Sequence, residues 1–245
     1  MKNKFINISY LIFGICAMWL VVDHITKFSF PDYFYNENPG IEFYVGINVV
    51  SAWADFSFFT YHTIILFSIW CILYSLSNFF KLEKLNCFIK HKAILVFLFT
   101  NYLITTVLYT FFELSSGNIT FGLYATNSKA FHNFGTNILG HYVFFVIMLI
   151  TFIKIKTQGN IKNKYLIYMS SYIFSYYLYV LLTGRFMYKI EWYPYPIFDS
   201  YSLFGKRLEV FLEIPLLLIL DGILTLIYFF LLKGLAKFKT KISEK

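Results

Sequence analysis

Residues 56–80 read FSFFTYHTIILFSIWCILYSLSNFF and contain no Asp, Glu, Lys or Arg. As an α-helix rising about 1.5 Å per residue, this stretch would be about 37 Å long, enough to cross a bilayer core of ~30 Å with some tilt. Four polar residues, Ser57, Thr60, His62 and Thr63, crowd its first two turns. The stretch therefore predicts a transmembrane helix with a polar entrance and an apolar interior.

The rest of the chain has the same character. Its 245 residues are 58% hydrophobic and 14% charged, with a mean hydropathy of +0.62, whereas soluble domains have about 25% charged residues. The sequence predicts an all-α, polytopic integral membrane protein that forms one domain over residues 1–245. Its six spans are expected at about residues 8–25, 56–80, 93–114, 134–153, 165–183 and 210–232.

The distribution of basic residues predicts the orientation of these spans. Of the 21 Lys and Arg residues, 15 fall in alternate segments predicted to face inward and six in the others. Cytoplasmic loops carry such an excess, so both termini are expected in the cytoplasm and the protein in the cell membrane. The same bias explains the net charge of +8. Nucleic-acid binding is not expected, because it needs a basic patch on a soluble surface.

Several other features limit the possible classes of function. No small-x-small cleavage site follows the first span, so it is expected to be an uncleaved anchor. The three cysteines, Cys16, Cys71 and Cys87, are widely spaced and form no CxxC motif, which supports neither a disulfide framework nor a zinc site. The sequence contains no cluster of His, Asp and Glu residues that would suggest a metal site. We therefore expect no cofactor, and the oligomeric state stays open.

The fourth predicted span, FGTNILGHYVFFVIMLITFI at residues 134–153, contains His141. An ionisable residue inside a membrane helix is costly and is by default a functional-site hypothesis. With the predicted orientation, Thr60 lies ~6 Å below the outer surface and His141 ~10 Å below it. Other polar residues are expected in or beside this layer, which predicts a polar pocket open to the outer leaflet: Asp23, His24, Asp55, His62, Glu113, His132, Arg185 and Glu213.

A threonine and a histidine at similar depth are the minimum set for acyl transfer. A hydroxyl becomes a useful nucleophile when a base about 2.6–3.2 Å away takes its proton, and imidazole suits that task near neutral pH. Structural readings stay open, since His141 could hydrogen-bond a neighbouring helix and Thr60 could bond its own backbone. Asp221, in the apolar inner half, could pair with a cation, mark a conduction path or be protonated.

Four blocks of the sequence resemble the androgen-induced-protein-like superfamily of six-span membrane proteins, especially its bacterial branch. They are Phe58-Phe59-Thr60, the NILGHY block that contains His141, the segment SYIFSYYLYVLLTG at residues 171–184, and WYPYPIFD at residues 192–199. The last block is the most specific. Two positions depart from the bacterial pattern: Thr63 and Ile64 replace a Ser-Asn pair, and Phe145 replaces a proline, which implies a straighter helix.

The resemblance implies a threonine hydrolase of fatty-acyl esters, because animal members of the superfamily cleave fatty-acid esters of hydroxy fatty acids. It assigns Thr60 as the nucleophile and His141 as the base, with a membrane lipid or lipid-like substrate. The alternative is a non-enzymatic transporter, lipid-binding protein or sensor that uses the same pocket, and Asp221 fits this alternative better.

Overall fold

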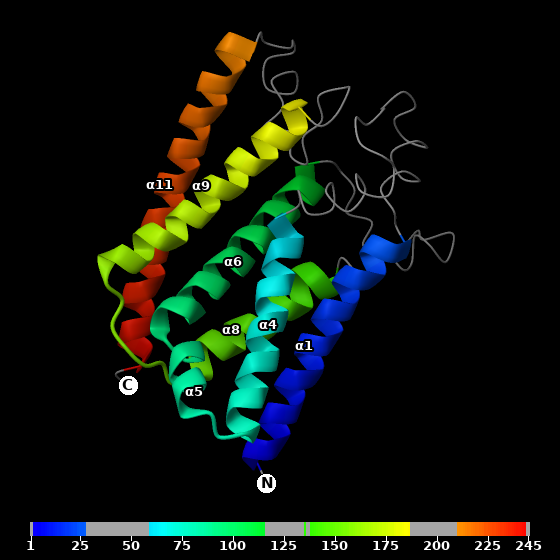
Figure 1. Ribbon diagram of the computed structural model, residues 1–245, viewed down its shortest axis with the longest axis vertical. Coiled ribbons are helices and arrows are strands. Elements are labelled where there is room, and N and C mark those ends of the chain that lie inside the picture. Colours follow the sequence, from blue (N-terminus) through cyan, green and yellow to red (C-terminus); the bar gives the residue numbers. More distant parts are fainter. Residues whose placement is uncertain (1, 28–58, 116–134, 136–137, 187–209, 244–245) are drawn as a thin grey trace. The chain divides into compact units, whose positions relative to one another are not determined.

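A computed structural model of the chain describes residues 2–27, 59–115, 135, 138–186 and 210–243 (Figure 1). These residues form helices and no strand, which confirms the all-α prediction for the part described. The WYPYPIFD segment and most of the predicted outer loops lie outside these ranges. Predictions for them are therefore not decided by the structure.

Among the described residues, five helices are long and apolar enough to cross a membrane, as a multi-pass membrane protein requires. They are α1 (Lys2–Lys27), α4 (Phe59–Phe79), α6 (Lys92–Ser115), α9 (Asn163–Phe186) and α11 (Val210–Ser243). The predicted span at residues 134–153 is represented by a shorter apolar stretch, the π-helical turn η1 (Leu139–Val143) followed by α8 (Phe144–Lys154). Six spans therefore remain a prediction.

Two helical segments were not expected from the sequence. A short helix, α5 (Glu83–Ile89), occupies the connection that was predicted as a plain loop between the second and third spans. The lysine-rich tail after residue 232 continues α11 as far as Ser243. Lysine is a good helix former, so composition alone does not end a helix at the membrane surface.

The chain divides into two compact units, which we describe separately. Unit 1 comprises Met1–Val22, Thr60–Ile161 and Gly234–Lys245, and unit 2 comprises Asp23–Phe59 and Lys162–Lys233. Unit 1 thus contains most of α1, nearly all of α4, all of α5, α6, η1 and α8, and the last turns of α11. Thr60 and His141 both belong to unit 1.

Close contact between α1 and α4 depends on a small residue. Ser68 Oγ donates to the Gly14 carbonyl oxygen at 2.7 Å, and a Cβ on Gly14 would lie 2.8 Å from Ile72 Cγ1. A second hydrogen bond, from Ser75 Oγ to the Asn7 carbonyl at 2.8 Å, fixes the antiparallel register. Small residues let helix backbones approach in membranes, where apolar burial alone drives little association.

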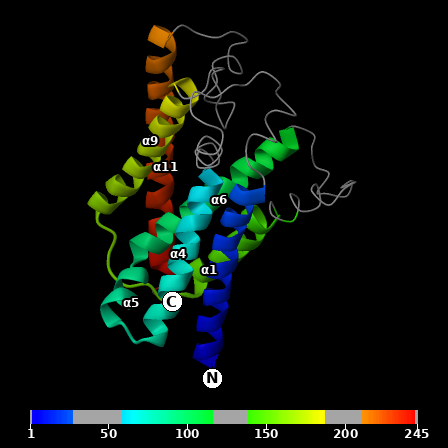
Figure 2. The same ribbon diagram turned by 45° about the vertical axis from the view of Figure 1, so that its right-hand side comes forward.

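Helix α8 is packed against three other helices of unit 1. Its Thr151 hydroxyl lies 2.8 Å from the Tyr10 hydroxyl of α1, and Phe152 stacks on Phe99 of α6 with ring centroids 4.3 Å apart. Phe144 packs against Phe67 of α4 at 5.6 Å. Figure 2 shows the same group of helices from a second direction. The turn that carries His141 is therefore anchored by a helix with partners on several sides.

The described basic residues of unit 1 lie at one end of its helices. This end contains the start of α1, the end of α4, the short helix α5, the end of α8 and the end of α11. We call this region the lysine-rich end. Backbone hydrogen bonds of 2.9 Å join Lys92 N to Gln158 O and Gln158 N to Lys90 O. The last turns of α11 are attached through Lys92 Nζ, which donates to Thr240 Oγ1 at 3.2 Å. The start of α1 and the end of α11 thus lie at the same end of unit 1 (Figure 1).

In the described residues, unit 2 consists of α9 and most of α11, together with the last turn of α1 from Asp23 and with Phe59. Aromatic rings supply its core, where Phe59 packs against Tyr176 with centroids 5.1 Å apart and Tyr228 is buried. Asp221 is also buried, with 3% of its surface exposed. Asp221 is therefore a second functional-site candidate, because an acidic residue in an apolar membrane helix is costly.

Candidate functional site

His141 lies at the centre of the π-helical turn η1. The Thr106 hydroxyl of α6 donates to the His141 carbonyl oxygen at 2.7 Å, so a neighbouring helix holds this carbonyl. π-Helical turns inside α-helices are rare and are frequent at functional sites. The helix is therefore irregular at His141, the residue that stands out in the sequence of this span. The irregularity occurs although Phe145 stands in place of a proline.

The His141 ring is almost completely enclosed. It is 7% exposed and stacks on Tyr109 of α6, with ring centroids 3.7 Å apart and planes 10° from parallel. Its Nδ1 is buried and has no hydrogen-bond partner among the described residues. In the neutral tautomer protonated on Nε2, Nδ1 is a free acceptor. Buried polar atoms are usually paired, so this one is available to a hydroxyl or a ligand.

Hydroxyl groups surround this turn on α4 and α6. Thr63 and Thr105 are joined by a hydrogen bond of 3.2 Å between their Oγ1 atoms, and Thr110 and Tyr142 by one of 3.1 Å. The buried Tyr102 hydroxyl has no hydrogen-bond partner among the described residues. Polar side chains thus lie where α4, α6 and η1 meet. Two of their buried atoms, the Tyr102 hydroxyl oxygen and His141 Nδ1, have no hydrogen-bond partner among the described residues.

Thr60 is the second residue of α4 and is half-buried. It lies on the same helix face as Ile64 and Phe67, because four and seven residues correspond to about one and two turns. That face is directed toward η1 and α8: a Cβ on Gly140 would lie 3.2 Å from Ile64 Cδ1, and Phe67 packs on Phe144. Thr60 is one turn, about 6 Å, before Ile64 along α4.

The structure therefore brings the two helix segments together, with His141 about one turn deeper than Thr60. Side chains on an α-helix lean toward its N-terminus, so the His141 ring leans toward the level of Thr60. Contact between Thr60 Oγ1 and the imidazole stays a prediction.

The other polar residues of the predicted layer are only partly described. Asp23 is buried and belongs to unit 2, and His62 is half-buried on α4. The remaining side chains lie outside the described residues: His24, Asp55, Glu113, His132, Arg185 and Glu213. Asn137, an amide near the start of the fourth predicted span, is also outside them. Within the described part, no three His, Cys, Asp or Glu residues are placed to hold a metal ion.

Sequence reasoning did not identify the residues that hold His141. Tyr109 covers its ring and Thr106 binds its carbonyl. A signal was present, because Asn101, Thr105 and Tyr109 recur every four residues in the third predicted span and place polar groups on one face. A polar face on a membrane helix points to protein rather than to lipid.

Comparison of the chain with known protein families, curated proteins and solved structures gave no match.

Proposed function

We propose that the protein is a membrane-embedded hydrolase of fatty-acyl esters, with Thr60 as nucleophile and His141 as general base. The observation that carries this proposal is the enclosed His141 ring with an unpartnered Nδ1, in a π turn that packs against the face of α4 bearing Thr60. The sequence blocks around Thr60 and His141, which resemble a superfamily of threonine hydrolases, support the same pair.

The proposed reaction has two steps. His141 accepts the Thr60 hydroxyl proton as the oxygen attacks the ester carbonyl, and the proton passes to the leaving alkoxide, which departs as an alcohol. His141 then deprotonates a water that attacks the acyl-threonine. The Thr60 oxygen leaves, takes that proton back from His141, and the fatty acid is released. Neither step needs a metal or a cofactor. Donors for the oxyanion would come from amides near the start of the fourth span.

The proposal includes a topology of six spans with both termini cytoplasmic. The start of α1 and the end of α11 lie together at the lysine-rich end, and the excess of lysine favours the cytoplasm for that end. The Thr60 end of α4 would then face the outer leaflet, so the ester would enter the polar pocket from the outside of the cell membrane.

The test uses the purified protein in detergent with a fluorophosphonate probe and a fatty-acyl p-nitrophenyl ester. Labelling and hydrolysis are expected in the wild type, and both should be lost in Thr60→Ala and in His141→Ala. Thr60→Ser should recover labelling because it restores a hydroxyl. The matched control is Thr100→Ala, whose hydroxyl bonds its own helix. Labelling that persists in both Thr60→Ala and His141→Ala would refute the catalytic assignment.

Asp221 favours a second candidate function, transport or sensing. Its Oδ1 accepts from Thr225 Oγ1 at 3.3 Å, whereas its buried Oδ2 has no partner among the described residues. Buried carboxyl groups in membrane helices mark ion or proton pathways. In vesicles loaded with a pH-sensitive dye, transport would appear as proton flux that Asp221→Asn removes and Thr60→Ala leaves unchanged. Equal flux in vesicles with and without the protein would exclude proton transport.

A further inference from the structure

Two lysines of the lysine-rich end are buried. Lys92, the first residue of α6, is 8% exposed, and Lys239, near the end of α11, is 1% exposed. Lys92 Nζ bonds Oγ1 of Thr240, which follows Lys239 in the chain, so both ammonium groups lie where α6 begins against the end of α11. Lysine is almost never fully buried unless it is paired, so two buried like charges require an explanation.

No carboxylate among the described residues neutralises this pair. Lys239 Nζ donates to the carbonyl oxygens of Phe152 and Ile155, and Lys92 Nζ donates to Thr240 Oγ1 at 3.2 Å. The described acid at this end, Glu83, is exposed on α5. Hydrogen bonds to neutral groups satisfy donors but leave two positive charges uncompensated, which is unfavourable in a buried position.

The ammonium groups, rather than the start of helix α6, provide the free donors. The first amides of α6 are already used, since Lys92 N donates to Gln158 O at 2.9 Å and Ala93 N donates to His91 Nδ1 at 3.2 Å. A lysine ammonium has three donors, and Lys92 uses one of them on Thr240. The site therefore has the charge and the vacant N–H groups to bind an anion.

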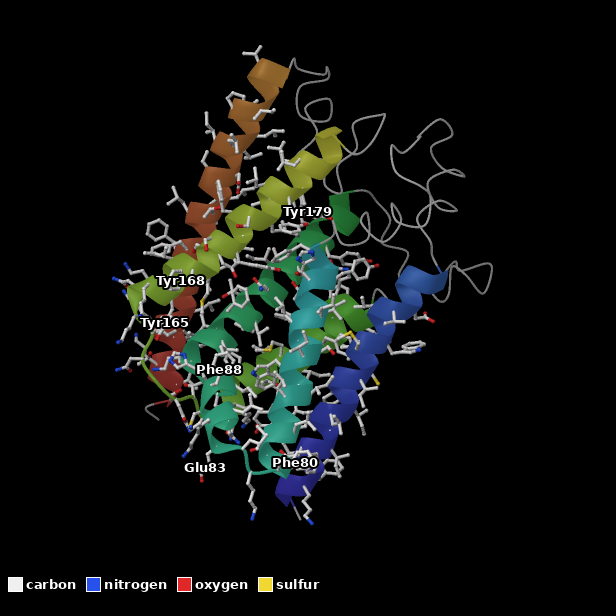
Figure 3. The ribbon with its side chains drawn as sticks, viewed as in Figure 1. Phe80, Glu83, Phe88, Tyr165, Tyr168 and Tyr179 are labelled. Atoms are coloured by element: carbon white, nitrogen blue, oxygen red, sulfur yellow. The ribbon has the colours of Figure 1, made fainter. Side chains whose placement is uncertain are left out.

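The surroundings indicate where that anion would come from. Large apolar side chains at this end are exposed, namely Phe80, Phe88 and Phe238, and Figure 3 shows Phe80 and Phe88 near α5 in unit 1. Exposed Phe side chains beside lysines are typical of segments that lie in the layer of lipid headgroups. Basic pockets between membrane helices on the cytoplasmic side bind acidic headgroups.

We propose that Lys92 and Lys239 form an anion site for a phosphate group, supplied by the headgroup of an acidic phospholipid of the inner leaflet. The phosphate oxygens accept hydrogen bonds from the unused N–H groups of Lys92. The negative charge of the phosphate offsets the repulsion between the two ammonium groups. The site is independent of Thr60 and His141.

Thermal unfolding of the full-length protein in neutral detergent tests this site. Dihexanoyl phosphatidylglycerol at about ten times its dissociation constant should raise the Tm by roughly 3–6 °C, and dihexanoyl phosphatidylcholine should not. Lys92→Gln should lose most of that shift and Lys92→Arg should keep it. The control Lys84→Gln removes an exposed lysine and should also keep it. A full shift in Lys92→Gln, or equal shifts from both lipids, would overturn the proposal.

Two further measurements separate the alternatives. If inorganic phosphate alone gives the full shift and phosphatidylglycerol adds nothing, the site binds soluble phosphate and the lipid assignment is wrong. If Lys92→Gln does not fold, native mass spectrometry of the wild type decides the question. Preferential retention of one phosphatidylglycerol over phosphatidylcholine supports the site, and equal loss of the two lipids overturns it.

Discussion

His141 and Lys239 are both ionisable residues buried in unit 1, but their surroundings differ. The Lys239 ammonium donates to two backbone carbonyls at the end of α8, Phe152 O and Ile155 O. His141 has an aromatic ring against its face and a buried Nδ1 without a partner among the described residues. A satisfied polar group stabilises the fold, whereas an unsatisfied one lowers stability and is retained for another reason. Lys239 is thus expected to hold the end of α8 and to contribute only its charge to the proposed anion site, whereas His141 is expected to take part in the reaction.

The comparison is tested most severely by His141→Ala. Loss of a general base should lower ester hydrolysis by about 10²–10⁴-fold. The fold should survive, because the variant removes an aromatic contact worth about 0.5–1.5 kcal/mol and no side-chain hydrogen bond. Steady-state hydrolysis and thermal unfolding in the same detergent measure the two effects, with Thr100→Ala as the control. A variant that retains its rate but unfolds readily would place His141 in the same structural class as Lys239.

Lys239→Met should show the opposite pattern. The variant leaves the Phe152 and Ile155 carbonyls without their donor, and an unsatisfied buried acceptor costs about 1–3 kcal/mol. We expect about 2–3 kcal/mol of destabilisation in reversible unfolding, with unchanged hydrolysis per folded molecule. The control is Lys237→Met, because Lys237 is exposed two residues earlier on α11. Equal stability of the two variants would show that the contacts of Lys239 contribute nothing net.

The same two residues show what could be predicted from sequence. Uncharged stretches of the sequence located the helices that are long and apolar enough to span a membrane. The predicted depths of Thr60 and His141 selected the segments of α4 and η1 that pack together in the structure. The π turn at Leu139–Val143 could not be foreseen, because LGHYV has no local signal for it and the Thr106 contact comes from another helix. The contacts of Lys239 could not be foreseen either, since composition does not reveal which carbonyls a lysine reaches.

Thr106→Val examines whether the π turn needs its neighbour. The isosteric change removes the donor to the His141 carbonyl, so we expect a loss of about 1 kcal/mol in unfolding free energy. Hydrolysis should fall by about tenfold if a misplaced base costs roughly 1.4 kcal/mol in the barrier. Thr100→Val is the control, because the Thr100 hydroxyl donates to Val96 O in its own helix. Loss of activity in both variants would remove any special role for the Thr106 contact.

Gly140→Ala should have the smallest effect on stability and tests the spacing between α4 and η1. The new methyl group would lie 3.2 Å from Ile64 Cδ1, so the two segments must separate by a few tenths of an ångström. Replacing a helical glycine otherwise gains about 1 kcal/mol, and the two effects nearly cancel in unfolding. Hydrolysis should nevertheless fall by a few fold, because about 0.5–1 kcal/mol in the barrier corresponds to such a change.

The double variant Gly140→Ala with Ile64→Val removes the clashing Cδ1 and should recover the rate. Gly222→Ala is the control, because a methyl group there meets open space, and it should leave the rate unchanged. If Gly140→Ala hydrolyses as fast as the wild type while unfolding at a higher temperature, the distance between the Thr60 face of α4 and the histidine turn does not limit the reaction. The functional difference between His141 and Lys239 would then depend on the hydrogen bonding of His141 and not on the spacing of the two helix segments.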